Sequence, residues 1–293
     1  MKNFLGAISL WLGAIAPMTL AAQDPQPHPA HLPTIEELTI VSAGSRMPGL
    51  IYVADGPGPH PTVVMLHGIP GNEKNLDIAQ ELRRQGFNTV FFHYRGAWGA
   101  EGDYSVLTLT DDAAAVVDYL RAPANAGRLR IDTHKISLLG HSLGGYTALA
   151  AGNRIESLSC VGAMAPVNMG LWQMGLAVED KNSLRLLEYA DTLFMLNNFN
   201  GAALLAQLRA GSLRELDTRG FGPGLKGKSV LLVVGEADPV TPAATMTLPV
   251  AKAYEDVPGL KVEAHVIPGD HSFSQSRLQL TGLLLEWLNR DCR

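Results

Sequence analysis

Short apolar runs alternate with helical patterns along most of the chain. Eight runs have the length and the branched or aromatic content of β-strands. They are EELTIV (36–41), GLIYVAD (49–55), TVVMLH (62–67), NTVFFHY (88–94), KISLLG (135–140), LSCVGAMA (158–165), SVLLVVG (229–235) and KVEAHVIP (261–268). The later runs are continuously apolar rather than alternating, which is typical of strands buried on both faces of a parallel sheet.

Helical patterns separate most of these strands. They cover residues 75–85, 109–120, 143–151, 242–254 and 274–289. Strands that alternate with helices are joined by right-handed crossovers and form an open twisted sheet with helices on its faces. The pattern therefore predicts an α/β protein with a mostly parallel, eight-stranded sheet.

One segment interrupts the alternation after the sixth strand. Residues 170–228 contain no strand pattern, but they contain the helical patterns LRLLEYADTLFMLNN and GAALLAQLRAGSLREL and end in the loop RGFGPGLKGK. Ligands of open α/β sheets bind beyond the carboxyl ends of the strands, and an insertion at this point would lie above that edge. We therefore expect a helical cap over residues 170–228.

The first 35 residues differ from the rest of the chain. Lys2, an apolar run over residues 4–20 and the small pair Ala21–Ala22 predict a secretory signal peptide over residues 1–22 and a secreted or periplasmic protein. An uncleaved membrane anchor is the alternative, because the run is nearly long enough to span a bilayer. Residues 23–35 are rich in Pro and His and are expected to form a linker before a domain over residues 36–293.

Composition excludes several classes of partner and site. The net charge is −5 and no run of Lys or Arg is present, so a nucleic-acid partner is not expected. Two cysteines are too few for a disulfide scaffold. Cys160 lies in an apolar run and is interpreted as a core residue, and Cys292 is next to last. An oxidising compartment would permit a bridge between them, but we expect them to be unpaired.

The segment GHSLGG, residues 140–145, is the strongest chemical signal and matches the pattern G-x-S-x-G. A buried strand pattern precedes it and an alanine-rich helix pattern follows it. A sharp strand-to-helix turn places its serine in a strained backbone conformation, which small neighbours tolerate, and exposes the hydroxyl above the sheet edge. Ser142 is therefore the candidate nucleophile.

A serine hydroxyl needs a base, and the base needs a group that orients it. Among nine histidines, His271 follows the last strand in the polar turn PGDHSF, where a loop can return its ring to the serine. Asp238 follows the strand over residues 229–235 and is the preferred carboxylate, with Glu236 as the fallback. Asp270 is adjacent to His271 and is assigned to turn formation.

Catalysis of acyl transfer also needs donors for the oxyanion. The N–H of Leu143, which follows the candidate nucleophile, is the first of these donors. The second is expected from the loop HGIPGN after the strand over residues 62–67, where Pro70 has no N–H and Ile69 or Gly71 remains. His67 is expected to brace this loop.

Together these segments resemble the α/β-hydrolase fold superfamily, with HGIPG as the oxyanion loop, GHSLGG as the nucleophile elbow, GEADPVTP as the acid loop and GDHSF as the histidine loop. The order Ser142, Asp238, His271 is the order of that superfamily. The resemblance implies Ile69 rather than Gly71 as the second donor. HYRGAWGAEGDY and GHSLGGY are similar to the small esterase and dienelactone-hydrolase-like group, which is related to serine peptidases of the prolyl oligopeptidase type.

The predicted function is that of a serine hydrolase, most simply a carboxylesterase for small or medium acyl esters. Such an enzyme needs a small-molecule ester but no metal or organic cofactor, and no stable membrane association is expected after signal cleavage. Trp98, Met169 and Trp172 are expected either to line the substrate pocket or to pack in the core. Arg95 pairs with a substrate carboxylate or anchors its own loop.

Three alternatives remain open at this stage. A peptidase or amidase would use the same three side chains, although the segment before the strand over residues 62–67 is too short for the propeller domain of oligopeptidases. A perhydrolase, or a lyase without an acyl-enzyme, is compatible with the same fold. A non-catalytic binding protein is the alternative from another class.

Overall fold

The computed structural model describes residues 26–293. The predicted signal peptide and the first three residues of the predicted linker lie outside the described residues. No helix between residues 26 and 293 is both long and apolar enough to cross a membrane.

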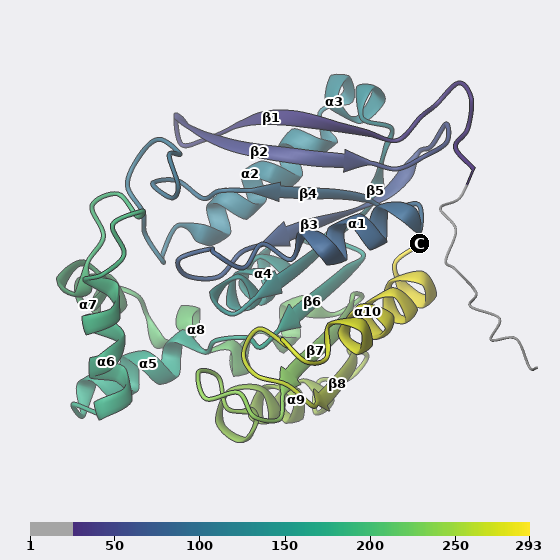
Figure 1. The fold of residues 1–293 in the computed structure, drawn as a ribbon. Helices are drawn as coiled ribbons and strands as arrows, with labels where there is room; N and C mark the ends of the chain where they lie inside the picture. Colours follow the sequence, from purple (N-terminus) through teal and green to yellow (C-terminus); the bar gives the residue numbers. More distant parts are fainter. Residues whose placement is uncertain (1–25) are drawn as a thin grey trace, which may run out of the picture.

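One sheet of eight strands forms the centre of the molecule (Figure 1). The strands are β1 (Thr34–Ser42), β2 (Ser45–Val53), β3 (His60–Leu66), β4 (Asn88–Phe92), β5 (Ile131–His141), β6 (Cys160–Met164), β7 (Ser229–Gly235) and β8 (Lys261–Ile267). Their order in the sheet is β1-β2-β4-β3-β5-β6-β7-β8. β2 is antiparallel to both β1 and β4, and every other neighbouring pair is parallel. The predicted fold class is confirmed.

Helices lie on both faces of the sheet and beyond one of its edges (Figure 1). They are α1 (Leu76–Arg84), α2 (Leu109–Arg121), α3 (Pro123–Arg128), α4 (Leu143–Arg154), α5 (Met169–Ala177), α6 (Lys181–Ala190), α7 (Gly201–Ala210), α8 (Leu213–Leu216), α9 (Leu248–Glu255) and α10 (Arg277–Asp291). Short turns of other helix types are η1 (Thr218–Gly220), η2 (Gly222–Leu225) and η3 (Ala243–Thr247). All five predicted helical stretches are present.

Each face of the sheet is covered by its own apolar core. On one face α2 and α4 pack against the sheet, and Leu149 and Val64 belong to the same buried cluster. On the other face α1 and α10 do so, and Leu284 and Val63 belong to a second cluster. Val63 and Val64 are neighbours on β3 and point to opposite faces, so a strand buried on both sides needs a continuous apolar run.

Two local predictions need correction. β1 begins at Thr34, so the strand includes the last two residues of the predicted linker. Thr34 and Ile35 pair with Val53 and Tyr52 of β2, and the long antiparallel pairing extends the strand beyond its apolar run. The helix α3 was not predicted, because its six residues bury none of their side chains and therefore have no apolar period.

The segment between β6 and β7 contains α5 to α8 and no strand, as its pattern predicts. We call residues 169–228 the cap. In Figure 1 its helices α5, α6 and α7 lie at the left, beyond the strand ends towards which β3 and β4 point. Buried apolar side chains of the cap, among them Leu204, Leu208 and Leu216, join it to the core on the face of α2 and α4. The cap is therefore packed onto the central sheet.

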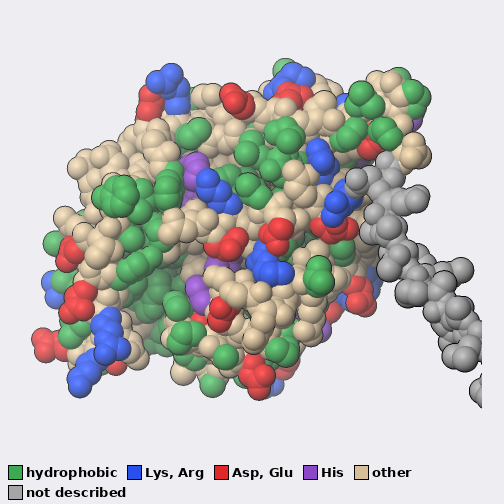
Figure 2. All heavy atoms as spheres, viewed as in Figure 1, with side chains coloured by type: hydrophobic (Ala, Val, Ile, Leu, Met, Phe, Trp, Pro, Cys, Tyr) green, Lys and Arg blue, Asp and Glu red, His purple; other side chains and the backbone are tan. Residues whose placement is uncertain are grey.

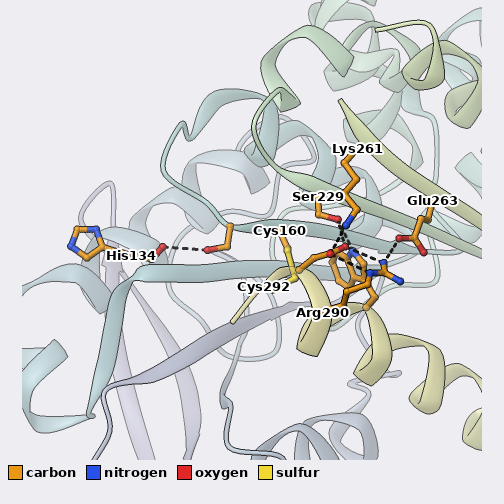
Figure 3. Close-up of a disulfide and its surroundings, with 10 residues drawn as sticks. His134, Cys160, Ser229, Lys261, Glu263, Arg290 and Cys292 are labelled. Carbon is orange, nitrogen blue, oxygen red and sulfur yellow. Dashed lines mark hydrogen bonds and ion pairs between the residues drawn. A yellow bond between two sulfur atoms is a disulfide. The ribbon is translucent and has the colours of Figure 1, made fainter. Parts of the chain in front are cut away.

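The prediction that the two cysteines are unpaired is wrong. Cys160 at the start of β6 and Cys292 after α10 form a disulfide, with Cα atoms 5.8 Å apart and a sequence separation of 132 (Figure 3). Both residues are buried beside α10. The packing of α10 on the sheet brings them into bonding range, and local sequence carries no signal for such a distant contact.

Candidate active site

The turn between β5 and α4 holds Ser142 in a backbone conformation that side chains rarely adopt, with φ 58° and ψ −120°. Three glycines avoid steric clashes around this turn. A Cβ at Gly140 would lie 1.9 Å from the carbonyl oxygen of Gly144, and a Cβ at Gly144 would lie 2.0 Å from that of Leu66. A Cβ at Gly145 would touch Pro166 at 3.0 Å. The glycines of GHSLGG therefore allow strand, helix and neighbouring loop to approach closely around the serine.

Ser142, His271 and Asp238 lie in one hydrogen-bonded row. The Ser142 Oγ is 3.0 Å from His271 Nε2, and His271 Nδ1 is 2.8 Å from Asp238 Oδ2. With its proton on Nδ1, the imidazole donates to Asp238 and leaves Nε2 free to accept the serine proton. The three loops that carry them follow β5, β7 and β8, whose carboxyl ends share one edge of the sheet. The side chains predicted from sequence thus come together although their positions along the chain differ by up to 129.

Asp238 is held as a carboxylate by more than the histidine. Its Oδ1 accepts the N–H groups of Val240 and Thr241, and its Oδ2 accepts the Thr241 hydroxyl at 2.6 Å. Burial disfavours the charged form, but the hydrogen bonds from His271 and Thr241 outweigh it and lower the pKa of Asp238 to about 2. Sequence reasoning missed Thr241, whose signal is its position three residues after the acid.

His141 is a second residue whose role the sequence did not indicate. It ends β5, is almost fully buried, and its Nε2 lies 2.7 Å from the main-chain carbonyl oxygen of His271. A carbonyl only accepts, so His141 Nε2 carries the proton and donates it. Burial lowers the pKa of His141 to about 4, which keeps the ring neutral near pH 7. His141 thus ties the serine turn directly to the histidine loop.

The loop after β3 lies against the serine. A Cβ at Gly68 would lie 2.9 Å from the Cβ of Ser142, so only a glycine fits there without a shift. Within residues 26–293, no group accepts a hydrogen bond from the N–H of Ile69 or of Leu143. Both predicted oxyanion donors are therefore free to bind a ligand. His67 braces the loop as expected, because its Nδ1 is 2.7 Å from the Gly68 carbonyl oxygen.

The three expected pocket residues have different surroundings. Met169 has no exposed surface and packs in the core, so it does not line an open pocket. Trp172 is partly buried against the same core. Trp98 is 38% exposed, and its Nε1 donates to the Pro70 carbonyl oxygen at 2.6 Å. Figure 2 shows hydrophobic side chains gathered between the cap and the neighbouring sheet edge, with histidine at their border.

The remaining charged candidates have structural partners. Arg95 donates to the buried carboxylate of Asp112 and thereby anchors its own loop. Asp270 accepts the N–H groups of Ser272 and Ser274, so it forms the predicted turn. Glu236 is exposed to solvent beside the buried Asp238. In the described part of the chain, no three His, Cys, Asp or Glu side chains are grouped as metal ligands.

The site and its sheet match a known family. Residues 63–279 match the Alpha/beta hydrolase family. The chain belongs to this family. Among curated relatives, 2,6-dihydropseudooxynicotine hydrolase of Paenarthrobacter nicotinovorans is 29% identical over 169 residues, which cover 55% of this chain and 43% of the relative. The uncharacterized protein YfhR of Salmonella typhimurium is 35% identical over 91 residues, covering 31% of this chain and 30% of the relative. The matches thus span less than half the length of these two relatives.

Solved structures of esterases and peptidases have the same architecture. Est1E from Butyrivibrio proteoclasticus superposes with a TM-score of 0.63 at 15% identity, over 87% of this chain and 98% of that chain. Pyrococcus horikoshii acylaminoacyl peptidase superposes with a TM-score of 0.66 at 17% identity, over 89% of this chain and 42% of that chain. At these identities the likeness shows the fold alone. The protein is an α/β hydrolase with esterase-like and peptidase-like structural neighbours.

Proposed function

We propose that this hydrolase is a serine carboxylesterase that cleaves small or medium acyl esters through an acyl-enzyme. The observation that carries the proposal is the row of hydrogen bonds from Ser142 through His271 to Asp238, at 3.0 and 2.8 Å. A nucleophile, a base and an orienting carboxylate at hydrogen-bond distance are what nucleophilic acyl transfer requires.

Each residue has one role in the proposed reaction. Ser142 Oγ attacks the ester carbonyl carbon while its proton passes to His271 Nε2. The N–H groups of Ile69 and Leu143 bind the oxyanion that forms. His271 then protonates the leaving alcohol. A water molecule attacks the acyl-enzyme as it gives a proton to His271, and His271 returns that proton to Ser142 Oγ as the acid leaves. Asp238 stabilises the imidazolium in both steps, and its low pKa keeps it ionised.

A peptidase is the second candidate. Its support is the structural likeness to an acylaminoacyl peptidase, which matches this chain as closely as the esterase does. Both reactions use the same three side chains, and they differ in whether the leaving group is an alcohol or an amine. Substrate preference therefore decides between them.

We further propose that the mature protein is exported after removal of residues 1–22. The lysine, apolar run and small residues of this segment support export, and so does the disulfide between Cys160 and Cys292. Disulfides persist in oxidising compartments such as the periplasm and the extracellular space. Mass spectrometry of the protein recovered from the periplasm or medium tests cleavage after Ala22 or Ala21.

The decisive experiment compares the purified wild type with Ser142→Ala on p-nitrophenyl esters of increasing acyl length and on an aminoacyl p-nitroanilide. Loss of the nucleophile is expected to lower kcat for esters by about 10⁴-fold or more, since residues of such a triad act as a unit. Ser157→Ala is the matched control, because Ser157 is exposed in the turn before β6. A fluorophosphonate should label the wild type and the control but not Ser142→Ala.

Each outcome has a definite meaning. Ester turnover that depends on Ser142 supports the esterase. Faster turnover of the anilide than of any ester supports the peptidase. Turnover that survives Ser142→Ala, or no turnover and no labelling of the wild type, contradicts a serine hydrolase of either kind.

A further inference from the structure

A loop between the sheet and the cap contacts the expected oxyanion loop. We call residues 94–104, between β4 and α2, the Trp98 loop. The Trp98 side chain reaches the loop after β3, where its indole N–H donates to the Pro70 carbonyl oxygen at 2.6 Å. Within residues 26–293, no other group donates to this carbonyl. Pro70 directly follows Ile69, whose N–H is the proposed second oxyanion donor.

The same loop is hydrogen-bonded to the cap through its main chain. The Trp98 N–H donates to the Met195 carbonyl at 3.0 Å, and the Asn197 N–H donates to the Gly96 carbonyl at 2.7 Å. A third bond runs from the Tyr104 N–H to the Asn197 carbonyl at 3.1 Å. The cap segment over residues 195–197 thus lies against the Trp98 loop like a short antiparallel strand, and one β-bridge joins the two segments.

Side chains strengthen this attachment. Asn197 Nδ2 donates to the Gly102 carbonyl at 2.7 Å and to Asp103 Oδ1 at 3.1 Å. Asn198 Nδ2 donates to the same Asp103 oxygen at 2.6 Å. Main-chain and side-chain hydrogen bonds therefore both fix the cap to the Trp98 loop.

Trp98 contacts both the cap and the loop after β3, so it does more than border a pocket. Its backbone lies in the left-handed region, with φ 52°, a conformation that bulky residues rarely adopt unless their surroundings impose it. Its main-chain N–H bonds the cap while its side-chain N–H bonds the oxyanion loop. One residue thus joins the cap to the loop that carries the proposed second oxyanion donor.

We propose that Trp98 is a positioning residue that couples the cap to the oxyanion loop. The proposal rests on the proposed function, because it assigns the Ile69 N–H to the oxyanion. A cap displaced by a bulky substrate moves Trp98, which releases the Pro70 carbonyl and turns the Ile69 N–H away from the reacting oxygen. The coupling therefore limits kcat for substrates that displace the cap.

Trp98→Phe tests the link, because it keeps an aromatic ring and removes the N–H. We expect kcat for a short-chain ester to fall about fivefold, the scale of one neutral hydrogen bond, with KM within about twofold of the wild type. Trp287→Phe is the matched control. It removes an indole N–H that donates to Ser229 Oγ beneath α10, away from the site, and should leave kcat unchanged.

Asn197→Ala tests the cap side of the same link. It should lower kcat in the same direction by about twofold, because one side-chain attachment is lost while the main-chain bonds remain. Asn182→Ala, on the exposed surface of α6, is its control in the cap. If the cap acts through Trp98, the double variant should be no slower than Trp98→Phe alone, and independent effects would instead multiply.

Amide exchange gives a readout that does not depend on turnover. Trp98→Phe and Asn197→Ala should both accelerate exchange of the amides in residues 68–73, and Trp287→Phe should not. Unchanged exchange there, or an unchanged kcat with a raised KM for long-chain esters, would overturn the proposal and make Trp98 a pocket wall. Accelerated exchange in a protein without Ser142-dependent turnover would retain the coupling and contradict the esterase.

Discussion

The two edges of the central sheet are built in opposite ways. At the carboxyl edge, Ser142, His271 and Asp238 come from loops and contact one another only through hydrogen bonds. At the other edge, side chains at the starts of β6, β7 and β8 are fastened to the end of α10 (Figure 3). We call this second group the C-terminal anchor; it comprises the Cys160–Cys292 disulfide and the contacts of Asp291 with Ser229, Lys261 and Arg290.

The difference lies in how completely polar groups are satisfied. Asp291 in the anchor accepts from Arg290, Lys261 and Ser229, and these bonds hold the pKa of its carboxyl well below the usual range. At the carboxyl edge, the N–H groups of Ile69 and Leu143 have no acceptor within residues 26–293. Unsatisfied donors lower stability but remain available to a reacting oxygen. We infer that the anchor stabilises the fold and that the carboxyl edge keeps its unpaired donors for binding a reacting group.

The largest effect should come from Asp238→Asn at the carboxyl edge. An amide cannot hold the imidazole in the required tautomer or stabilise its charge, so kcat should fall by about 10⁴-fold. Glu236→Gln, in the same loop but exposed, is the matched control and should retain activity. Kinetics on a p-nitrophenyl ester check both variants. Loss of activity in Glu236→Gln but not in Asp238→Asn would mean that the carboxylate is misassigned.

An intermediate effect, on stability alone, should come from the anchor. Replacing both Cys160 and Cys292 by alanine should lower the free energy of unfolding by about 2–5 kcal/mol, because the open chain gains conformational freedom when unfolded. Urea unfolding measures this loss, and kcat below the transition should stay within about twofold of the wild type. A proportional loss of kcat in the folded variant would show that the two edges are not independent.

The last effect is a change in how stability depends on pH. Burial lowers the pKa of His67 to about 3, and burial together with Lys74 lowers that of His93 to about 4, as burial does for His141. The unfolded chain binds these protons first, so their contribution to stability is complete above about pH 6.5 and is lost as the pH falls towards 4. Asp238, whose pKa is depressed, loses its contribution only below about pH 3.8.

These histidines lie at the carboxyl ends of β3, β4 and β5, so acid should weaken the catalytic edge before the anchor. His93→Gln should reduce the slope of the free energy of unfolding against pH between pH 6.5 and 4, because up to one proton fewer is bound on unfolding. Urea unfolding at several pH values measures this slope. His265→Gln, with its ring exposed on the edge strand β8, is the control. Equal slopes in the wild type and His93→Gln would refute this assignment of acid sensitivity.

The parts of the site predicted from sequence are those whose signals are local. Ser142 is marked by the glycines beside it, and Asp238 and His271 are marked by strands that end just before them. The roles of Thr241 and His141 were not predicted, because a threonine after an acid and a histidine before a serine act only through the groups that they contact in the folded chain. The sequence left Met169 open between pocket and core; Asn168 caps α5, and the packing of that helix places Met169 in the core.

The sequence by itself determined the strand-helix alternation, the sheet buried on both faces and the order of the three candidate catalytic residues. Hydrophobic period and turn residues act over a few positions, so these features can be read without coordinates. Only the tertiary structure decided the Cys160–Cys292 disulfide, the bond from His141 to the histidine loop and the link from the cap through Trp98 to Pro70. Each joins residues distant along the chain, and their distances and directions exist only once the sheet, α10 and the cap have packed together.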